Sequence, residues 1–551
     1  MSGDRAIIQD ESAPAAKAAD SAASWRIRVR DATRFAPRIG FLLLSIALAA
    51  AIVRFQFMDL QLRPLRIAAL SAGLLLGAWR VRYGILALVF TAPLLGVIPR
   101  LQGAIDLPLP EHVLLPLLVC GAVRLLWART PRARTAIDVP LMIYMVVVAI
   151  SAARALAEYC ALGNSLWDIV GPQLNRHFSF DIWDFARGPF LVVHYTIVAA
   201  EGALWFVLLT APSVELRAAD LRRALVLSAV AVALVGSAQS VWHFGLIPFF
   251  QRVQPGLIRI NATLPDPNTL GSFLILILPL GIIAALSRRR GAWLAAGWSG
   301  LLLYCLIRSV SRSAWIGFAV AAVGAVVVTG WRPDLLGMRL SQRAQRWLRR
   351  AIIASVPLAA AAVLAVTLGV MGRDISYGTA RSPLDMVLFT LNLRRPLNEL
   401  VPARPDHWQA AINIWRDFPL LGAGVGKYTV LKNRYLPEAR GRWMFFTEAH
   451  NYYLKILCEL GAVGLVAFLA VLAGVARQAQ QAWILADDAG RRRVAAITVG
   501  LVAFLVSSLA QDPLTLREMQ SGGGRTAGCG ASLGRSRCVH VEQSSPSSYK
   551  K

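Results

Sequence analysis

Long apolar runs are the feature of this sequence that most restricts its fold. Many of them approach the ~20 residues that a helix needs to cross ~30 Å of hydrocarbon. The runs lie at 39–53, 65–79, 83–99, 112–127, 137–157, 189–211, 223–246, 268–286, 292–307, 313–330, 351–371, 452–475 and 494–510. Only 16% of the 551 residues are charged, against about 25% in soluble proteins. Because a bilayer core offers the backbone no water, the sequence predicts an all-α polytopic membrane protein with about 12–14 transmembrane helices.

The net charge of +27 is spread along the chain rather than gathered in one domain. Basic clusters follow every second apolar run, at 129–134, 217–223, 288–290, 332–350 and 477–493, and another lies in the N-terminal segment at 26–38. This alternation is typical of loops on the cytoplasmic side of a membrane, so a nucleic-acid partner is not expected. The intervening segments at 159–188, 247–267, 308–312 and 372–450 then lie outside, which is the periplasm if the cell is Gram-negative.

The same alternation predicts how the chain is divided. We expect a disordered cytoplasmic N-terminus (1–35), a transmembrane bundle (36–371), a large periplasmic loop (372–450), C-terminal transmembrane helices (451–510) and an atypical low-complexity tail (511–551). No cleavable signal peptide is evident, so the first span is expected to act as the anchor. The six cysteines have no metal-ligand spacing, and neither a metal site nor a disulfide framework is predicted.

Four ionisable residues stand at the outer ends of predicted spans: Arg259, Arg308, Arg312 and His450. A single arginine at such a boundary has an ordinary explanation, which is that it reaches the lipid headgroups. Together the arginines can form a cationic pocket that binds a diphosphate, since guanidinium groups bind phosphate oxygens bidentately. The imidazole of His450 can accept a proton from an attacking hydroxyl at neutral pH. A helix cap or a buried hydrogen-bonding histidine is the competing interpretation of His450.

Three further polar residues are candidates for supporting roles. Asn268 is expected to cap the helix that begins near it, and Asn451 adjoins His450. Glu459 lies nine residues beyond His450, or ~13 Å along a helix, and is expected to hydrogen-bond or ion-pair with a neighbouring helix. Gly461 and Gly464 are interpreted as residues for close helix packing.

The stretch "DHWQAAINIWRDFPLLGAGVGKY" predicts an ordered part of the large loop. Trp408, Ala411, Ile412 and Trp415 recur at helical spacing and predict an apolar face. Pro419 and the glycines at 422, 424 and 426 then predict a break and a turn. These glycines lack the strand and helix that flank a nucleotide-binding loop, so nucleotide binding is not predicted.

Four motifs together resemble the superfamily of O-antigen ligases and Wzy-type polymerases. They are "NATLPDPNTLGSFLILILPL", "SRSAWIGF", "HWQAAINIWRDFPLLGAGVGKY" and "HNYYLKILCELGAVGLVAF". They occur in the family's order within 250–475. The resemblance implies an inner-membrane glycosyltransferase of lipopolysaccharide biosynthesis that needs neither metal nor cofactor. Such an enzyme moves a glycan from an undecaprenyl diphosphate carrier to a hydroxyl acceptor on the periplasmic side.

In this resemblance the family's loop histidine corresponds to His450, the expected base. Its diphosphate-binding arginines correspond to Arg312 and Arg259, and Arg308 or Arg404 are possible helpers. The acceptor is the lipid A-core in a ligase, and the transfer would invert the sugar.

Three alternatives stay open at this point. A polymerase would use the same chemistry with a second carrier-linked glycan as acceptor. A polysaccharide transporter or flippase predicts internal repeats and charges near the membrane midplane, and the sequence has no evident repeat. A structural membrane subunit would leave the combination of arginines and histidine unexplained.

Overall fold

The computed structural model describes thirteen stretches of the chain and confirms the all-α class. They are 63–95, 109–127, 134–161, 165–179, 188–242, 253–254, 257–264, 266–286, 291–331, 341–368, 379–401, 404–435 and 449–511. The predicted N-terminal segment, the first apolar run and nearly all of the tail therefore lie outside the described residues. Within these stretches, eight helices are long and apolar enough to cross a membrane.

Most bundle helices coincide with apolar runs, but two of them extend nine and ten residues beyond theirs. Their bounds are α2 Arg63–Leu95, α4 Leu109–Trp127, α5 Asp138–Cys160, α7 Gly188–Leu209, α8 Ala218–Trp242, α9 Pro267–Ala285, α10 Ala292–Ser309, α11 Arg312–Trp331, α12 Gln342–Thr367, α17 Tyr452–Leu485 and α18 Asp488–Ser507. The sequence predicts the runs 65–79 and 83–99 as two separate spans. The first run and residues 83–95 of the second instead belong to one helix, α2, which is interrupted at Arg80, where φ is −153° and ψ is 112°.

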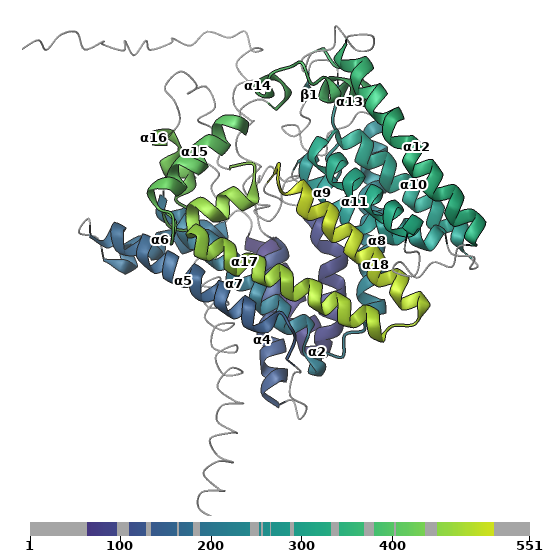
Figure 1. Ribbon diagram of the computed structural model, residues 1–551. Helices are drawn as coiled ribbons and strands as arrows, with labels where there is room; N and C mark the ends of the chain where they lie inside the picture. The colour runs from purple at the N-terminus through teal and green to yellow at the C-terminus, as the bar shows by residue number, and fades with distance from the viewer. Residues whose placement is uncertain are drawn as a thin grey trace, which may run out of the picture.

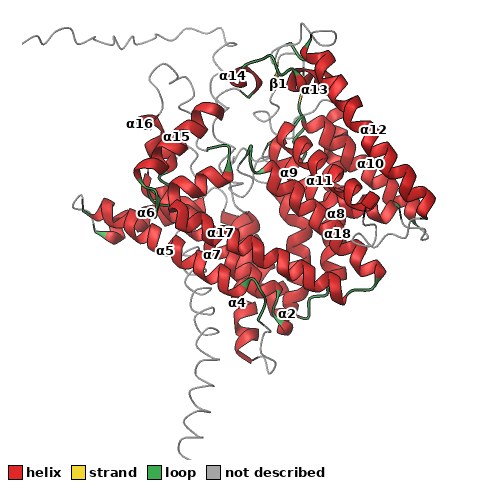
Figure 2. Cartoon of the chain, in the orientation of Figure 1, coloured by secondary structure: helices red, strands yellow, loops and turns green. Residues whose placement is uncertain are grey.

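Shorter elements occupy the predicted outer segments. They are α6 Leu166–Ser179, the ribbon of β1 Val253–Gln254 and β2 Leu257–Ile258, α13 Pro383–Leu391, α14 Leu397–Leu400, α15 Arg404–Asp417 and α16 Tyr428–Tyr435; the 3-10 turn η2 Pro212–Val214 precedes α8. Figure 1 shows α13 and α14 at the top right and top centre, and α15 and α16 at the upper left, all over the same end of the bundle. Figure 2 shows that α13, α14, α15 and α16 are all helical.

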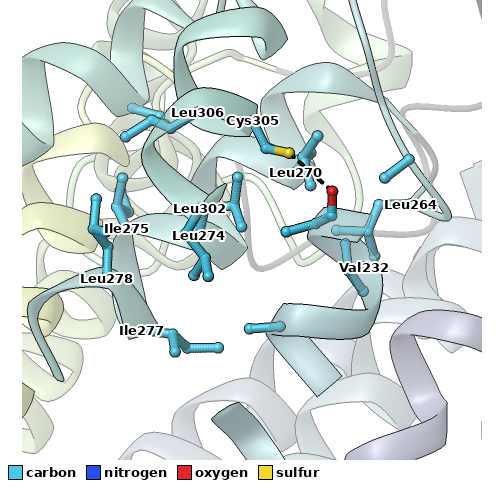
Figure 3. Close-up of a cluster of buried hydrophobic side chains, with 14 of the residues drawn as sticks. Val232, Leu264, Leu270, Leu274, Ile275, Ile277, Leu278, Leu302, Cys305 and Leu306 are labelled. Atoms are coloured by element: carbon cyan, nitrogen blue, oxygen red, sulfur yellow. Dashed lines mark hydrogen bonds between the residues drawn. The ribbon is translucent and has the colours of Figure 1, made fainter. Parts of the chain in front are cut away.

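The most extensive core lies among α8, α9, α10, α11 and α18. Figure 3 shows Leu274 of α9 beside Leu302 of α10 and Leu270 of α9 near Cys305 of α10, all four 0% exposed. Glycines bring α9, α11 and α18 unusually close: a Cβ added at Gly317 would lie 2.3 Å from the carbonyl oxygen of Ala503. Small residues at such crossings permit close van der Waals packing where no hydrophobic effect drives association. A second core joins α5, α7 and α17.

The helix predicted in the large loop is present as α15, but its predicted apolar face is only partly the buried one. The buried side chains are Asp406, His407, Ala410, Ala411 and Ile414. The tryptophans on which the prediction relied are only half-buried. Ala411 and Ile414 pack in one buried cluster with residues of the following turn, α16 and α17. The buried face of α15 is therefore offset by one position from the two tryptophans.

Candidate functional site

The glycine-rich turn after α15 is bound to a break in α17. At Gly461 the backbone leaves the helix, with φ 70° and ψ −170°. The Ala423 and Gly424 amides donate to the Cys458 and Glu459 carbonyls at 2.8 and 2.9 Å. The Ala462 and Val463 amides donate in turn to the Pro419 and Leu420 carbonyls at 2.9 and 3.1 Å. We call this four-bond contact between 419–424 and 458–463 the glycine clasp, and it satisfies the polar groups that the break exposes.

Glycine is required at two positions of the clasp. Gly422 has φ 67°, and a Cβ there would lie 2.3 Å from the Glu459 carbonyl carbon. Gly461 has φ 70°, and its added Cβ would lie 2.1 Å from the Leu420 carbonyl oxygen. The prediction that Gly461 packs two helices together was therefore incomplete, because it also breaks its own helix.

Helix α5 holds the same turn from the other side. The Val425 amide donates to Ser151 Oγ at 2.9 Å, and the Arg154 guanidinium donates to the Gly422 carbonyl oxygen. Lys427 forms an ion pair with Glu158. The turn is thereby fixed to the bundle.

His450 lies directly before α17 in a left-handed conformation, with φ 51°. The helix cap is Asn451, whose side chain accepts from the Leu454 amide at 3.1 Å. Capping is therefore not the role of the His450 side chain, which is half-buried. The Trp408 indole donates to the His450 carbonyl oxygen at 3.4 Å, which joins α15 to this turn.

A second histidine, His407, contacts His450 and was not identified from the sequence. The two rings meet edge to face, with centroids 5.6 Å apart and planes at 78°. His407 is 0% exposed, and its Nδ1 is 2.9 Å from the Tyr428 hydroxyl. The Tyr428 amide donates to Glu459 Oε1 at 3.3 Å, which is the kind of hydrogen bond predicted for Glu459. The spacing of 407, 410, 411 and 414 is the helical signal that could have revealed His407.

Burial, and secondarily the positive charge of Lys432, lower the pKa of His407 from 6.5 to about 3. His407 is therefore neutral in the folded protein across the physiological range. The edge-to-face contact therefore places no second positive charge beside the His450 ring.

The lowered pKa predicts that acid destabilises the protein through His407. Between pH 6.5 and 3 the unfolded chain binds a proton at His407 that the folded protein excludes. The contribution of His407 to the free energy of unfolding is therefore fully present above pH 6.5. It falls as the pH drops below 6.5, by at most about 1.4 kcal/mol per pH unit. Thermal unfolding measured from pH 7.5 to 4.5 should show a shallower decline in His407→Gln than in the unsubstituted protein. Equal declines would contradict this account.

The arginines gather where α9, α10 and α11 meet. Arg259 is 6% exposed; it donates from Nε to the Ser309 carbonyl oxygen and from Nη2 to Asn268 Oδ1, both at 3.0 Å. Arg312 begins α11 and donates to the Leu400 carbonyl oxygen at the end of α14. Arg308 donates to Ser240 of α8 at 2.8 Å. Arg259, Asn268 and the 308–312 turn thus form one hydrogen-bonded group.

The predicted helix cap at Asn268 was wrong by two residues. Asp266 caps α9 and accepts from the Asn268 amide at 2.7 Å. Proline is favoured at the first helical position, so Pro267 signals this start. The Asn268 side chain, freed from capping, holds Arg259 instead.

The C-terminal end of α18 joins the histidines to the arginines. The Tyr452 amide, two residues after His450, donates to the Ser508 carbonyl oxygen at 3.0 Å. Gln511 accepts from the Ser313 hydroxyl at 2.9 Å, and Ser313 follows Arg312. Both groups therefore lie at the same end of the bundle.

The large loop provides a second connection between Arg312 and the two histidines. Arg312 contacts Leu400, and the Arg404 amide donates to the Val401 carbonyl oxygen at 3.2 Å. Arg404 precedes His407 by three residues of α15, a rise of about 4.5 Å. The chain thus leads from the Arg312 contact to the His450 ring within one short segment.

The chain was compared with protein families and with curated proteins. Residues 273–469 match the family model described as O-antigen ligase. That span includes Arg312, both histidines and the glycine clasp, whereas Arg259 precedes it. A search of curated proteins gives no match for the chain.

Proposed function

Through residues 273–469 this chain belongs to the O-antigen ligase family, and from that premise we propose that it is an inner-membrane glycosyltransferase of ligase type. Its donor is a glycan linked to undecaprenyl diphosphate, and its acceptor is a hydroxyl of the lipid A-core. The observation that carries the proposal is the placement of Arg312 and His450 at one end of the bundle, joined through α18 and the 400–407 segment. By the alternation of basic loops this end faces the periplasm.

In the proposed reaction, His450 accepts the proton of the acceptor hydroxyl. The hydroxyl oxygen forms a bond to the anomeric carbon while the bond from that carbon to the diphosphate oxygen breaks. The leaving diphosphate carries the electron pair, and Arg312 and Arg259 stabilise its charge. One displacement of this kind inverts the anomeric centre. Because guanidinium charge supplies the stabilisation, we propose that neither a metal nor a cofactor is required.

The remaining candidates have subsidiary roles in this proposal. Arg404 lies one helical turn from His407 and can approach the same diphosphate. Arg308 of α10 donates a hydrogen bond to Ser240 of α8 and contributes positive charge beside that helix. Asn451 caps α17 and Glu459 holds α16, so both position the histidines rather than touch substrate.

Replacing Arg312 by lysine tests the diphosphate assignment. Lysine keeps the charge but loses the planar pair of donors that fits phosphate oxygens. We expect the KM for the lipid diphosphate donor to rise at least about tenfold in Arg312→Lys, with the acceptor KM unchanged. Arg434→Lys on α16, where the arginine is exposed, is the matched control. An unchanged donor KM in Arg312→Lys would rule out this role.

A deletion strain distinguishes a ligase from a polymerase. If the chain is a ligase, its loss leaves long glycan on the carrier and lipid A-core without polymer. If it is a polymerase, the loss leaves lipid A-core bearing single repeat units. Electrophoresis of the surface polysaccharide separates these two outcomes.

A further inference from the structure

A cavity of about 550 Å³ opens at the other end of the bundle from the histidines. It lies between the first turns of α8 and α18, the last turns of α9 and the beginning of α10. Helix α18 runs from this cavity to the Ser508 and Gln511 contacts over 20 residues, or about 30 Å, which is the thickness of a bilayer core. The cavity and the candidate site thus lie at opposite membrane surfaces.

The lining of this basic cavity combines arginines with apolar walls. Arg222 and Arg223 come from α8, and Arg492 and Arg493 come from α18. The other eight lining residues are apolar, and no carboxylate is among the twelve. Positive charge therefore stands at the mouth of a hydrophobic pocket.

Nearby carboxylates offset only part of this charge. Asp220 lies 3.6 Å from Arg223, which is 77% exposed, and Asp220 also binds Arg82. Asp487 lies 3.9 Å from Arg493. Asp488 in the first turn of α18 is a third carboxylate near the lining. Among the described residues, three carboxylates thus stand near five arginines, so the basic cavity retains an excess of positive charge.

We propose that the basic cavity binds an anionic phospholipid of the cytoplasmic leaflet. Its phosphate lies among the arginines, and the start of an acyl chain lies against Val226, Leu280 and Ile283. Basic pockets between transmembrane helices on the cytoplasmic side have this chemistry, and the Trp298 indole is suited to headgroup depth. Free phosphate would leave the apolar walls uncovered. The site is separate from glycosyl transfer and does not depend on the proposed function.

Native mass spectrometry of the detergent-solubilised full-length protein tests the site. Titration with phosphatidylglycerol should show one tightly retained lipid, whereas phosphatidylcholine should not be retained. The double variant Arg222→Gln/Arg492→Gln should weaken phosphatidylglycerol binding by about fivefold per arginine, roughly 25-fold together. The matched control is Arg346→Gln/Arg350→Gln on α12, which removes the same charge from the same predicted membrane side outside the basic cavity.

A variant that fills the basic cavity without changing charge separates lipid binding from general attraction. Ala284→Trp places an indole where the acyl chain would lie, and should abolish retention of phosphatidylglycerol. Equal retention of the two lipids by the unsubstituted protein would overturn the proposal. So would equal losses in the two arginine pairs, unchanged binding in Ala284→Trp, or displacement of the lipid by millimolar inorganic phosphate.

Discussion

His450→Asn should lose glycosyl transfer by a factor of about 10² to 10⁴, the usual contribution of a general base. Asparagine tolerates the left-handed conformation that His450 adopts at φ 51°. It therefore removes the imidazole while preserving the turn before α17, which alanine would strain. Transfer is measured with the purified protein, a carrier-linked glycan and a hydroxyl acceptor.

The control for this variant is Asn413→Ala on α15. Its side chain accepts from Gln409 one turn earlier on that helix. Asn413→Ala should retain transfer, and both variants should insert in the membrane and unfold near the same temperature. Full transfer by His450→Asn would remove His450 from the mechanism.

Gly422→Ala should destabilise the protein by at least about 3 kcal/mol. A left-handed alanine alone costs about 1–2 kcal/mol, and its Cβ would lie 2.3 Å from the Glu459 carbonyl carbon, which is backbone and cannot rotate away. The four hydrogen bonds of the glycine clasp must then lengthen or break. We expect a large fall in the thermal unfolding midpoint and, since α15 carries His407, a loss of transfer.

Gly324→Ala on α11 is the matched control for the clasp variant. A Cβ added there would meet no atom within 4 Å, and alanine is favoured over glycine within a helix. Gly324→Ala should therefore unfold at the same temperature as the unsubstituted protein or slightly above it. Similar losses in the two variants would show that the clasp geometry is not the cause.

The membrane helices were predictable because hydropathy acts locally. The run 452–475 became the first part of α17, and the run 268–286 became α9, each within one residue at its start. The break at Gly461 was not predictable in this way, since the apolar pattern continues through it. Its cause lies about 40 residues earlier, in the backbone groups of 419–424 that bind the exposed carbonyls and amides.

The candidate site was predictable only in its individual residues. The positions of Arg259, Arg312 and His450 beside apolar runs marked them as outer-end residues, but their connections through Ser508 and Gln511 depend on α18. His407 was missed because the aromatic stripe of α15 dominated the helical pattern. Its neighbour in space, His450, is 43 positions away along the chain, and only the fold reveals that pair.

Release of the carrier in a reconstituted system tests the central claim most directly. The protein is placed in liposomes with an undecaprenyl diphosphate-linked glycan as the sole donor and a lipid A-core acceptor. We predict that free undecaprenyl diphosphate appears in equal amount to glycosylated acceptor, and that His450→Asn produces neither. Movement of the intact donor across the bilayer, with the glycan still attached and no glycosylated acceptor, would contradict the account and identify a transporter instead.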